Sequence, residues 1–126
     1  MKKINSILEE IKFPEIVKVK QNFDKRKLED VKAEIKKLLK EGNFKNKIEK
    51  GKTVAITGGS RGISHYSIIM KIIVDFVKEE GGIPFIVPAM GSHGRGDANG
   101  QKHILKNLGI TEESMGCEIR SSMKVV

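Results

Sequence analysis

Two short apolar runs, each followed by a glycine-rich polar turn, constrain the fold of this chain more than any other feature. The runs span residues 53–57 and 83–89. The turns read Gly58-Gly59-Ser60-Arg61-Gly62 and Gly91-Ser92-His93-Gly94. Apolar residues between the two runs recur at helical spacing, which predicts a βαβ unit over residues 52–90 with parallel strands. We therefore expect an α/β fold of three layers, with a mainly parallel sheet and flanking helices.

The two apolar runs show little alternation between apolar and polar residues, a pattern typical of parallel strands buried on both faces. Ligands of such sheets bind outside the carboxyl ends of the strands. Both glycine turns follow strand ends, so we expect them to meet at one edge of the sheet.

Residues 1–51 read as a lysine-rich segment of helices with an edge strand. The pattern predicts an amphipathic helix at residues 4–11, an edge strand at 15–20 and a helix that begins near Asp24 and ends at Gly42. A short basic helix or turn follows at residues 43–51. Residues 52–126 form the α/β core, and the two parts make one domain.

Further helices are expected after the first glycine turn, where Ser64 is the candidate N-cap, and after Asp97 and Thr111. Residues 119–126 resemble the start of another strand. Because no closing element follows this strand, we expect an incomplete N-terminal domain.

Composition excludes several classes of protein. No apolar run approaches the ~20 residues of a membrane span. The net charge of +8 suits an anionic partner, but with five Phe, one Tyr and no Trp there are few aromatics for base stacking, which disfavours nucleic acid. The single cysteine, Cys117, precludes an intrachain disulfide and fits a reducing cytoplasm. The three histidines and Cys117 lack zinc-type spacing, so no metal site is predicted.

The chemistry-bearing residues lie in the two turns. Glycines allow close backbone approach, and the N–H groups at a helix start attract anions. Arg61 adds a planar fork that matches a carboxylate or phosphate, and His93 can exchange a proton near pH 7. A solvated Arg61 in an ordinary turn and a surface histidine are the competing interpretations.

The first turn also matches part of the Thr-Gly-x-x-x-Gly-Ile-Gly motif that opens short-chain dehydrogenases. Ser64 replaces the last glycine of that motif, and the second strand ends without an acidic residue for a ribose hydroxyl. An NAD(P)-binding module of this kind therefore stays an alternative, as does a non-catalytic domain that binds anions or nucleic acid.

Four motifs occur in order along residues 52–126. They read Gly-Ser-Arg-Gly-Ile, Pro-Phe-Ile-Val-Pro-Ala-Met-Gly-Ser-His-Gly, Gly-Ile-Thr-Glu-Glu-Ser and Ile-Arg-Ser-Ser-Met. With these motifs the chain resembles the N-terminal domain of the nickel-dependent lactate racemase family and its 2-hydroxy-acid racemase and epimerase relatives.

The resemblance implies a two-domain α/β enzyme that uses a nickel pincer nucleotide, a nickel-holding pyridinium-3,5-bisthiocarboxylic acid mononucleotide. This cofactor takes a hydride from the α-carbon of a small 2-hydroxy acid and returns it. By position, His93 corresponds to an acid/base histidine. The cofactor- and substrate-contacting turn corresponds to Gly58, Gly59, Ser60 and Arg61.

Well-known lactate racemases have Asp where this chain has Gly58, which leaves the identity of the 2-hydroxy acid open. The family's cofactor-bonding lysine, second acid/base histidine and nickel-ligating histidine come later than residue 126. The resemblance therefore implies that most of the cofactor is held beyond residue 126 and that the present chain is inactive alone.

Overall fold

A parallel sheet organises the part of the chain that the computed structural model describes, residues 14–24 and 27–124. Its strands, in spatial order, are β1 (Thr53–Gly58), β2 (Ile83–Pro88) and β3 (Glu118–Ile119). Thr53 is in register with Ile83 and Gly58 with Pro88, so β1 and β2 end together. The predicted α/β class and βαβ unit are confirmed.

Helices α3 (Tyr66–Glu79) and α4 (Ala98–Asn107) pack on the same face of this sheet. Right-handed crossovers that proceed in one direction across a sheet require this placement. The core residues confirm it, because Val74 of α3 and Leu105 of α4 share one buried cluster with the strand residues Ile56 and Ile86. That cluster is made of Ile56, Met70, Val74, Val77, Ile86, Met90, Leu105, Ile110, Met115 and Ile119.

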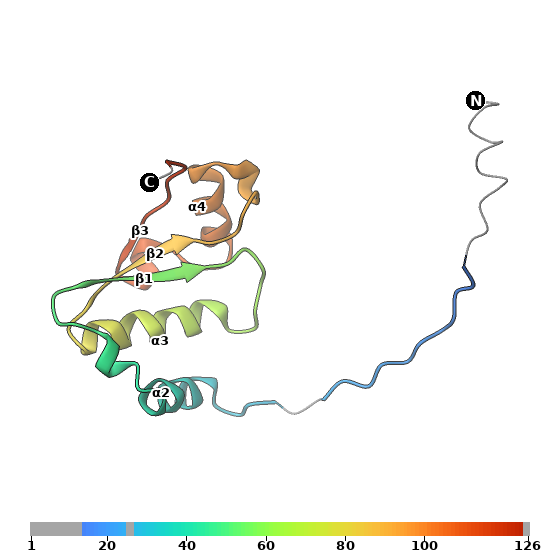
Figure 1. Ribbon diagram of the computed structural model, residues 1–126, viewed down its shortest axis with the longest axis horizontal. Coiled ribbons are helices and arrows are strands. Elements are labelled where there is room, and N and C mark those ends of the chain that lie inside the picture. The colour runs from blue at the N-terminus through green and yellow to red at the C-terminus, as the bar shows by residue number, and fades with distance from the viewer. Residues whose placement is uncertain (1–13, 25–26, 125–126) are drawn as a thin grey trace.

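The third layer is α2 (Val31–Glu41), which lies against the outer side of α3 (Figure 1). The layers therefore run α2, then α3 with α4, then the sheet. No helix of the described residues covers the other face of the sheet, where Thr53, Ala55 and Thr57 are exposed. The expectation that the strands are buried on both faces is wrong, since burial alternates along β1.

One contact on the uncovered face links β2 to the residue after β3. The guanidinium carbon of Arg120 lies 4.1 Å from the centroid of the Phe85 ring, a cation–π geometry that shields part of the ring from water. The Arg120 backbone N–H donates to Ile86 O at 2.8 Å, so the parallel pairing of the third strand continues past Ile119. The strand expected from residue 119 onward is only partly found, because β3 covers Glu118–Ile119 and residues 120–124 are not assigned to a strand.

In the segment that precedes β1, several predictions differ from the structure. The predicted helix at 4–11 lies outside the described residues. Residues 15–20 form no strand. They are exposed in a segment that leads away from the body (Figure 1). No neighbouring strand among the described residues is available to pair with this segment. Helix α2 begins after Asp30, whose carboxylate accepts the Ala33 N–H at 2.9 Å, so Asp24 is not its N-cap.

The start of α3 also differs from the prediction. Its N-cap is His65 in a left-handed conformation, with no capping hydrogen bond from its side chain, and not Ser64. Asp97 caps α4 as predicted, with its Oδ1 accepting the Gly100 N–H at 2.8 Å. Thr111 caps α5 (Glu112–Met115) through a reciprocal capping box with Ser114. Two single-turn 3₁₀ helices complete the list, η1 (Lys45–Lys47) and η2 (Gly94–Gly96).

Within the described ranges, no helix combines the length and apolar character that a membrane crossing requires.

Candidate functional site at the carboxyl edge of the sheet

The two glycine turns lie side by side where β1 and β2 end. The strands are parallel and in register to Gly58 and Pro88, so each turn leaves the sheet at the same edge. One further backbone bond holds the exits together, as the Ala89 N–H donates to Gly58 O at 2.8 Å. We call the surface formed by residues 59–62 and 91–95 the rim.

A side-chain hydrogen bond joins the two turns across the rim. Ser60 Oγ lies 2.6 Å from His93 Nδ1, although the two residues are 33 positions apart in the sequence. Sequence reasoning placed both residues at one sheet edge but did not pair them, because spacing along the chain gives no sign of this contact. The available signal was topological, since both residues follow the ends of adjacent parallel strands.

The first turn is fastened to α3. The Gly59 N–H donates to the hydroxyl of Tyr66 at 2.7 Å, and Tyr66 is the first residue of that helix. A Cβ built on Gly59 or on Gly62 would meet no atom closer than 3.9 Å. The backbone here is therefore open on the side where a ligand can approach.

Gly58 has a different environment from its neighbours in the turn. It is buried, and a Cβ on it would lie 3.0 Å from Leu105 Cδ2 and 3.4 Å from Ile86 Cγ2. Its missing side chain makes room for α4 on the sheet. The structure thus places Gly58 in the interior, whereas Gly59 and Ser60 are half-buried at the rim.

Arg61 is exposed in the same turn, directly after Ser60. Its guanidinium makes no hydrogen bond or ion pair to any residue that the structure describes. The five N–H donors of this side chain are therefore available to bind an anionic ligand.

The second turn is held by one hydrogen bond from α4 and by one backbone hydrogen bond with the residue that precedes the turn. Gln101, a buried polar residue of α4, donates from Nε2 to Gly91 O at 2.8 Å. The His93 N–H donates to Met90 O at 3.2 Å. The imidazole is exposed, so His93 has a fixed backbone and a side chain that reaches solvent.

Two non-glycine residues with positive φ lie close in sequence to the two turns, one after the first turn and one at the end of the second. His65, with φ of 61°, precedes α3, and Arg95, with φ of 63°, lies within η2. Such conformations cost of the order of 1–3 kcal/mol for residues with a Cβ, and they cluster at ligand-binding sites. Their positions beside the two turns are consistent with a functional rim.

The other two histidines have no recorded hydrogen bond to Ser60 or His93. His103 is exposed on α4, and His65 is exposed as the N-cap of α3. Among the residues with described placement, no group of three or more His, Cys, Asp or Glu could hold a metal ion.

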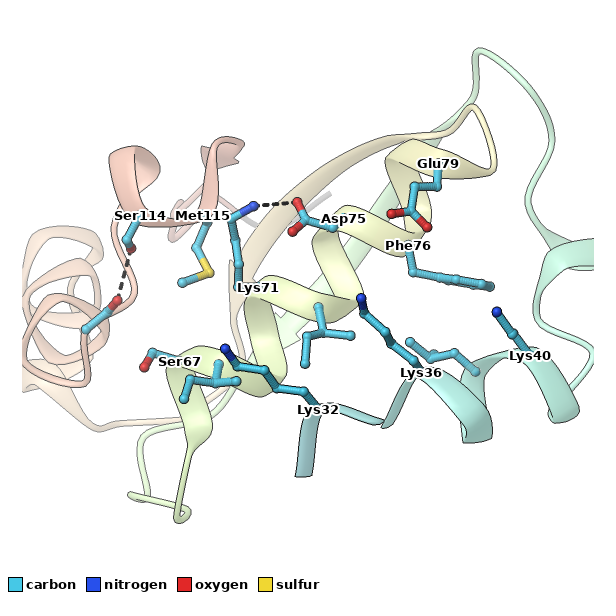
Figure 2. A pocket seen from close by; sticks show the side chains of 14 residues that line it. Lys32, Lys36, Lys40, Ser67, Lys71, Asp75, Phe76, Glu79, Ser114 and Met115 are labelled. Carbon is cyan, nitrogen blue, oxygen red and sulfur yellow. Dashed lines mark hydrogen bonds and ion pairs between the residues drawn. The ribbon is translucent and has the colours of Figure 1, made fainter. Parts of the chain in front are cut away.

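A groove of about 520 Å³ lies elsewhere, between α2 and α3. Figure 2 shows Lys32, Lys36 and Lys40 of α2 reaching toward α3, where Lys71 and Asp75 form an ion pair. Its walls include no residue of the rim. The helix α2 has no buried residue, so its lysines are not in a closed cavity. Their aliphatic stems can lie along the apolar helix surface while the ammonium groups stay in water, and this arrangement explains why lysines line the groove.

Comparison of the chain with protein-family models, with curated proteins and with solved structures gives no match. The chemistry of the rim therefore has to be inferred from its own residues. An unpaired guanidinium, open glycine backbone and a hydrogen-bonded imidazole together suit a small anionic ligand that gains or loses a proton.

Proposed function

We propose that this chain is the N-terminal portion of a racemase or epimerase that acts on lactate or another 2-hydroxy acid with a nickel pincer nucleotide. The observation that carries the proposal is the meeting of the two turns at the rim, with Ser60 Oγ 2.6 Å from His93 Nδ1. The resemblance of residues 52–126 to the lactate racemase family supplies the reaction class. The rim supplies two of the chemical groups that this reaction needs.

The fit of the cofactor to the described residues is partial. The missing side chains at Gly59 and Gly62 leave space for its anionic groups, and the exposed Arg61 can bind them, although the Gly59 N–H is taken by the Tyr66 hydroxyl. Among the described residues no group of three or more His, Cys, Asp or Glu could hold a metal ion, and the resemblance places the nickel-ligating histidine beyond residue 126. When bound, the cofactor supplies the hydride acceptor for the α-carbon of the substrate.

The residues of this chain then bind the substrate and move its proton. Arg61 binds the carboxylate of the 2-hydroxy acid, for which its planar fork is matched. His93 takes the proton of the substrate hydroxyl and returns it after the configuration has changed. Both residues are exposed at the rim, so a small acid can reach them without rearrangement of the core.

Two measurements test this proposal. In the cofactor-loaded enzyme that contains this chain, His93→Ala should lower kcat about 10²–10⁴-fold, the usual contribution of a positioned acid/base group. His103→Ala, an exposed histidine on α4, is the matched control and should leave the rate unchanged. Full activity of His93→Ala would overturn the assignment.

The second measurement uses the chain itself. Amide chemical shifts of residues 59–62 and 91–95 are followed while D- or L-2-hydroxy acids are added to millimolar concentration, with Arg61→Gln as the variant. We expect shifts at the rim that Arg61→Gln abolishes. Shifts with NAD⁺ and none with the hydroxy acids would favour the dinucleotide-binding alternative instead. Binding of duplex DNA that weakens steeply with salt would favour the nucleic-acid alternative.

A further inference from the structure

The hydrogen bond between Ser60 and His93 leaves the two ring nitrogens of the histidine unequal. Nδ1 is engaged by Ser60 Oγ at 2.6 Å, while Nε2 has no hydrogen-bond partner among the described residues. A serine hydroxyl can accept a hydrogen bond from Nδ1–H or donate one to a bare Nδ1, and these two arrangements correspond to different tautomers with different proton-accepting nitrogens. The contact thus bears directly on how His93 works.

Ser60 is well placed to hold the imidazole in one orientation. Its own position is fixed from the preceding residue, because the Gly59 N–H donates to the Tyr66 hydroxyl at 2.7 Å. The backbone of His93 is fixed separately by the bond from its N–H to Met90 O. The contact with Ser60 is the hydrogen bond that the structure records for the exposed imidazole itself.

We infer that Ser60 is a positioning residue for His93. Its Oγ accepts the Nδ1–H of the imidazole, so that the neutral ring presents a bare Nε2 at the rim. This assignment rests on the proposed function for the source of the proton. It also gives Ser60 a role different from the cofactor contact that the family resemblance implies.

The proton balance of the step is simple. The substrate O–H bond breaks, its electron pair stays on the substrate oxygen, and a new N–H bond forms at Nε2. The resulting imidazolium keeps its Nδ1–H on Ser60 Oγ, which accepts from both the neutral and the charged ring. In the reverse step Nε2 returns the proton, and the hydrogen bond to Ser60 is unchanged throughout.

The test is the tautomer of His93 in the chain itself, read from the ¹⁵N shifts of ¹⁵N-histidine-labelled protein. The measurement is made at about pH 8.5, well above the ordinary imidazole pKa of about 6.5. We expect the Nδ1–H form to predominate for His93. Exposed His103 provides the internal reference for an imidazole in solvent.

Variants of the serine make the test specific. Ser60→Ala should shift the His93 tautomer ratio at least threefold toward that of His103, and Ser60→Thr should restore it. Ser92→Ala is the matched control, since Ser92 lies beside His93 in the same turn and has no recorded side-chain hydrogen bond; it should not change the ratio. An Nε2–H form that predominates, or an equal ratio in Ser60→Ala, would overturn the inference.

The rate of the cofactor-loaded enzyme separates this inference from the proposed function. Ser60→Ala should lower kcat about tenfold with little change in KM, and Ser60→Thr should recover most of the loss. If His93→Ala abolishes activity while the tautomer is indifferent to Ser60, the proposed function stands and the role of Ser60 is wrong. If the tautomer depends on Ser60 but no 2-hydroxy acid is turned over, the positioning stands and the proposed function is wrong.

Discussion

Leu105 of α4 lies directly against Gly58 at the end of β1, with its Cδ2 3.0 Å from where a Cβ of residue 58 would be. The contact brings α4 onto the sheet beside the exit of the first glycine turn. It also explains in packing terms why a residue without a side chain stands at position 58. A side chain at this position points into the interior and not into the rim.

Introducing an acidic side chain at position 58 should therefore damage the fold. Gly58→Asp places a carboxylate among Leu105 and Ile86 without a partner, and an uncompensated buried charge costs on the order of 3–5 kcal/mol. Urea denaturation measures the loss. Gly62→Ala is the control, because its Cβ would meet only Leu108 Cδ2 at 3.9 Å, and it should change stability by less than about 1 kcal/mol. A stable Gly58→Asp protein would contradict this account of the site.

A second prediction concerns the turn that carries His93. Gly94 has φ of +66°, and a Cβ on it would lie 2.5 Å from the carbonyl carbon of Gly100. Gly94→Ala should thus destabilise the turn through a clash between backbones as well as strain, and disturb the Ser60–His93 contact. Gly91→Ala separates the two effects, since φ is +58° there with no atom within 4 Å. We expect a loss of about 1 kcal/mol from strain alone in Gly91→Ala and a clearly larger loss in Gly94→Ala, measured by thermal denaturation. Equal losses would show that the turn moves to avoid the clash.

A third prediction follows from Glu112, which ties α5 to β3. Its Oε1 accepts the Ile119 N–H at 3.0 Å, and this hydrogen bond, assisted by the charge of Lys102, holds the pKa of the carboxyl below its usual value of 4.5. Since the pKa is lowered in the folded state, the contribution of Glu112 to stability is present above pH 4.5 and is lost as the pH falls through the lower folded value. Hydrogen exchange of the Ile119 amide, corrected for its intrinsic rate, should accelerate in that range.

The control for this pH dependence is the neighbouring acid. Glu112→Gln should remove the acid-linked change at Ile119, because the amide does not titrate. Glu113→Gln should retain it, because Glu113 is exposed and takes no part in the bond to Ile119. An unchanged pH profile in Glu112→Gln would show that another group controls the amide.

A fourth prediction concerns the thiol of Cys117. Burial raises its pKa above the ordinary 9.0, and the positive charge of Lys78 only partly opposes this effect. The rate of alkylation by iodoacetamide should therefore reach half of its maximum at a higher pH in the folded chain than in the same chain in 8 M urea. Coincident pH profiles would show that the folded chain does not desolvate this thiol.

Residues 52–126 were far easier to predict than the preceding segment, and the reason is physical. In this region each strand or helix is predicted by two features of the sequence, an apolar pattern within the element and a glycine or capping side chain at its end. Asp97, Thr111 and Gly109 act as expected, with Gly109 at φ of +78° after α4. Local chemistry and tertiary packing point the same way in this region.

Elsewhere a local signal had no packing to support it. Ile16 is 97% exposed, so alternation at residues 15–20 did not suffice to form a strand without a neighbour to pair with. Both Asp24 and Asp30 are chemically suitable caps, and the structure uses Asp30 at the start of the helix that packs on α3. The sequence did not predict that one face of the sheet is uncovered. The continuous apolar run of β2 is compatible with helices on either face or on both.

The candidate site was predictable in its location but not in its contacts. Strand order and parallel direction suffice to bring the two turns to one edge. The interior position of Gly58 and the bond from Ser60 to His93 depend on where α4 settles and on how each turn closes. Those are properties of three-dimensional packing that no spacing in the sequence encodes.

Among the described residues, the buried apolar cluster lies on the side of the sheet that α3 and α4 cover, so substitutions on the other side should be better tolerated. Ala55 is exposed on the side that no described helix covers, while Cys117 is half-buried and its pKa is raised. In an Ala55→Cys variant, the exposed thiol at position 55 should react with a fluorescent label faster than the half-buried Cys117 does, and the label should leave the interior intact. Such a label would test for ligand binding at the rim while leaving Ser60, Arg61 and His93 unchanged.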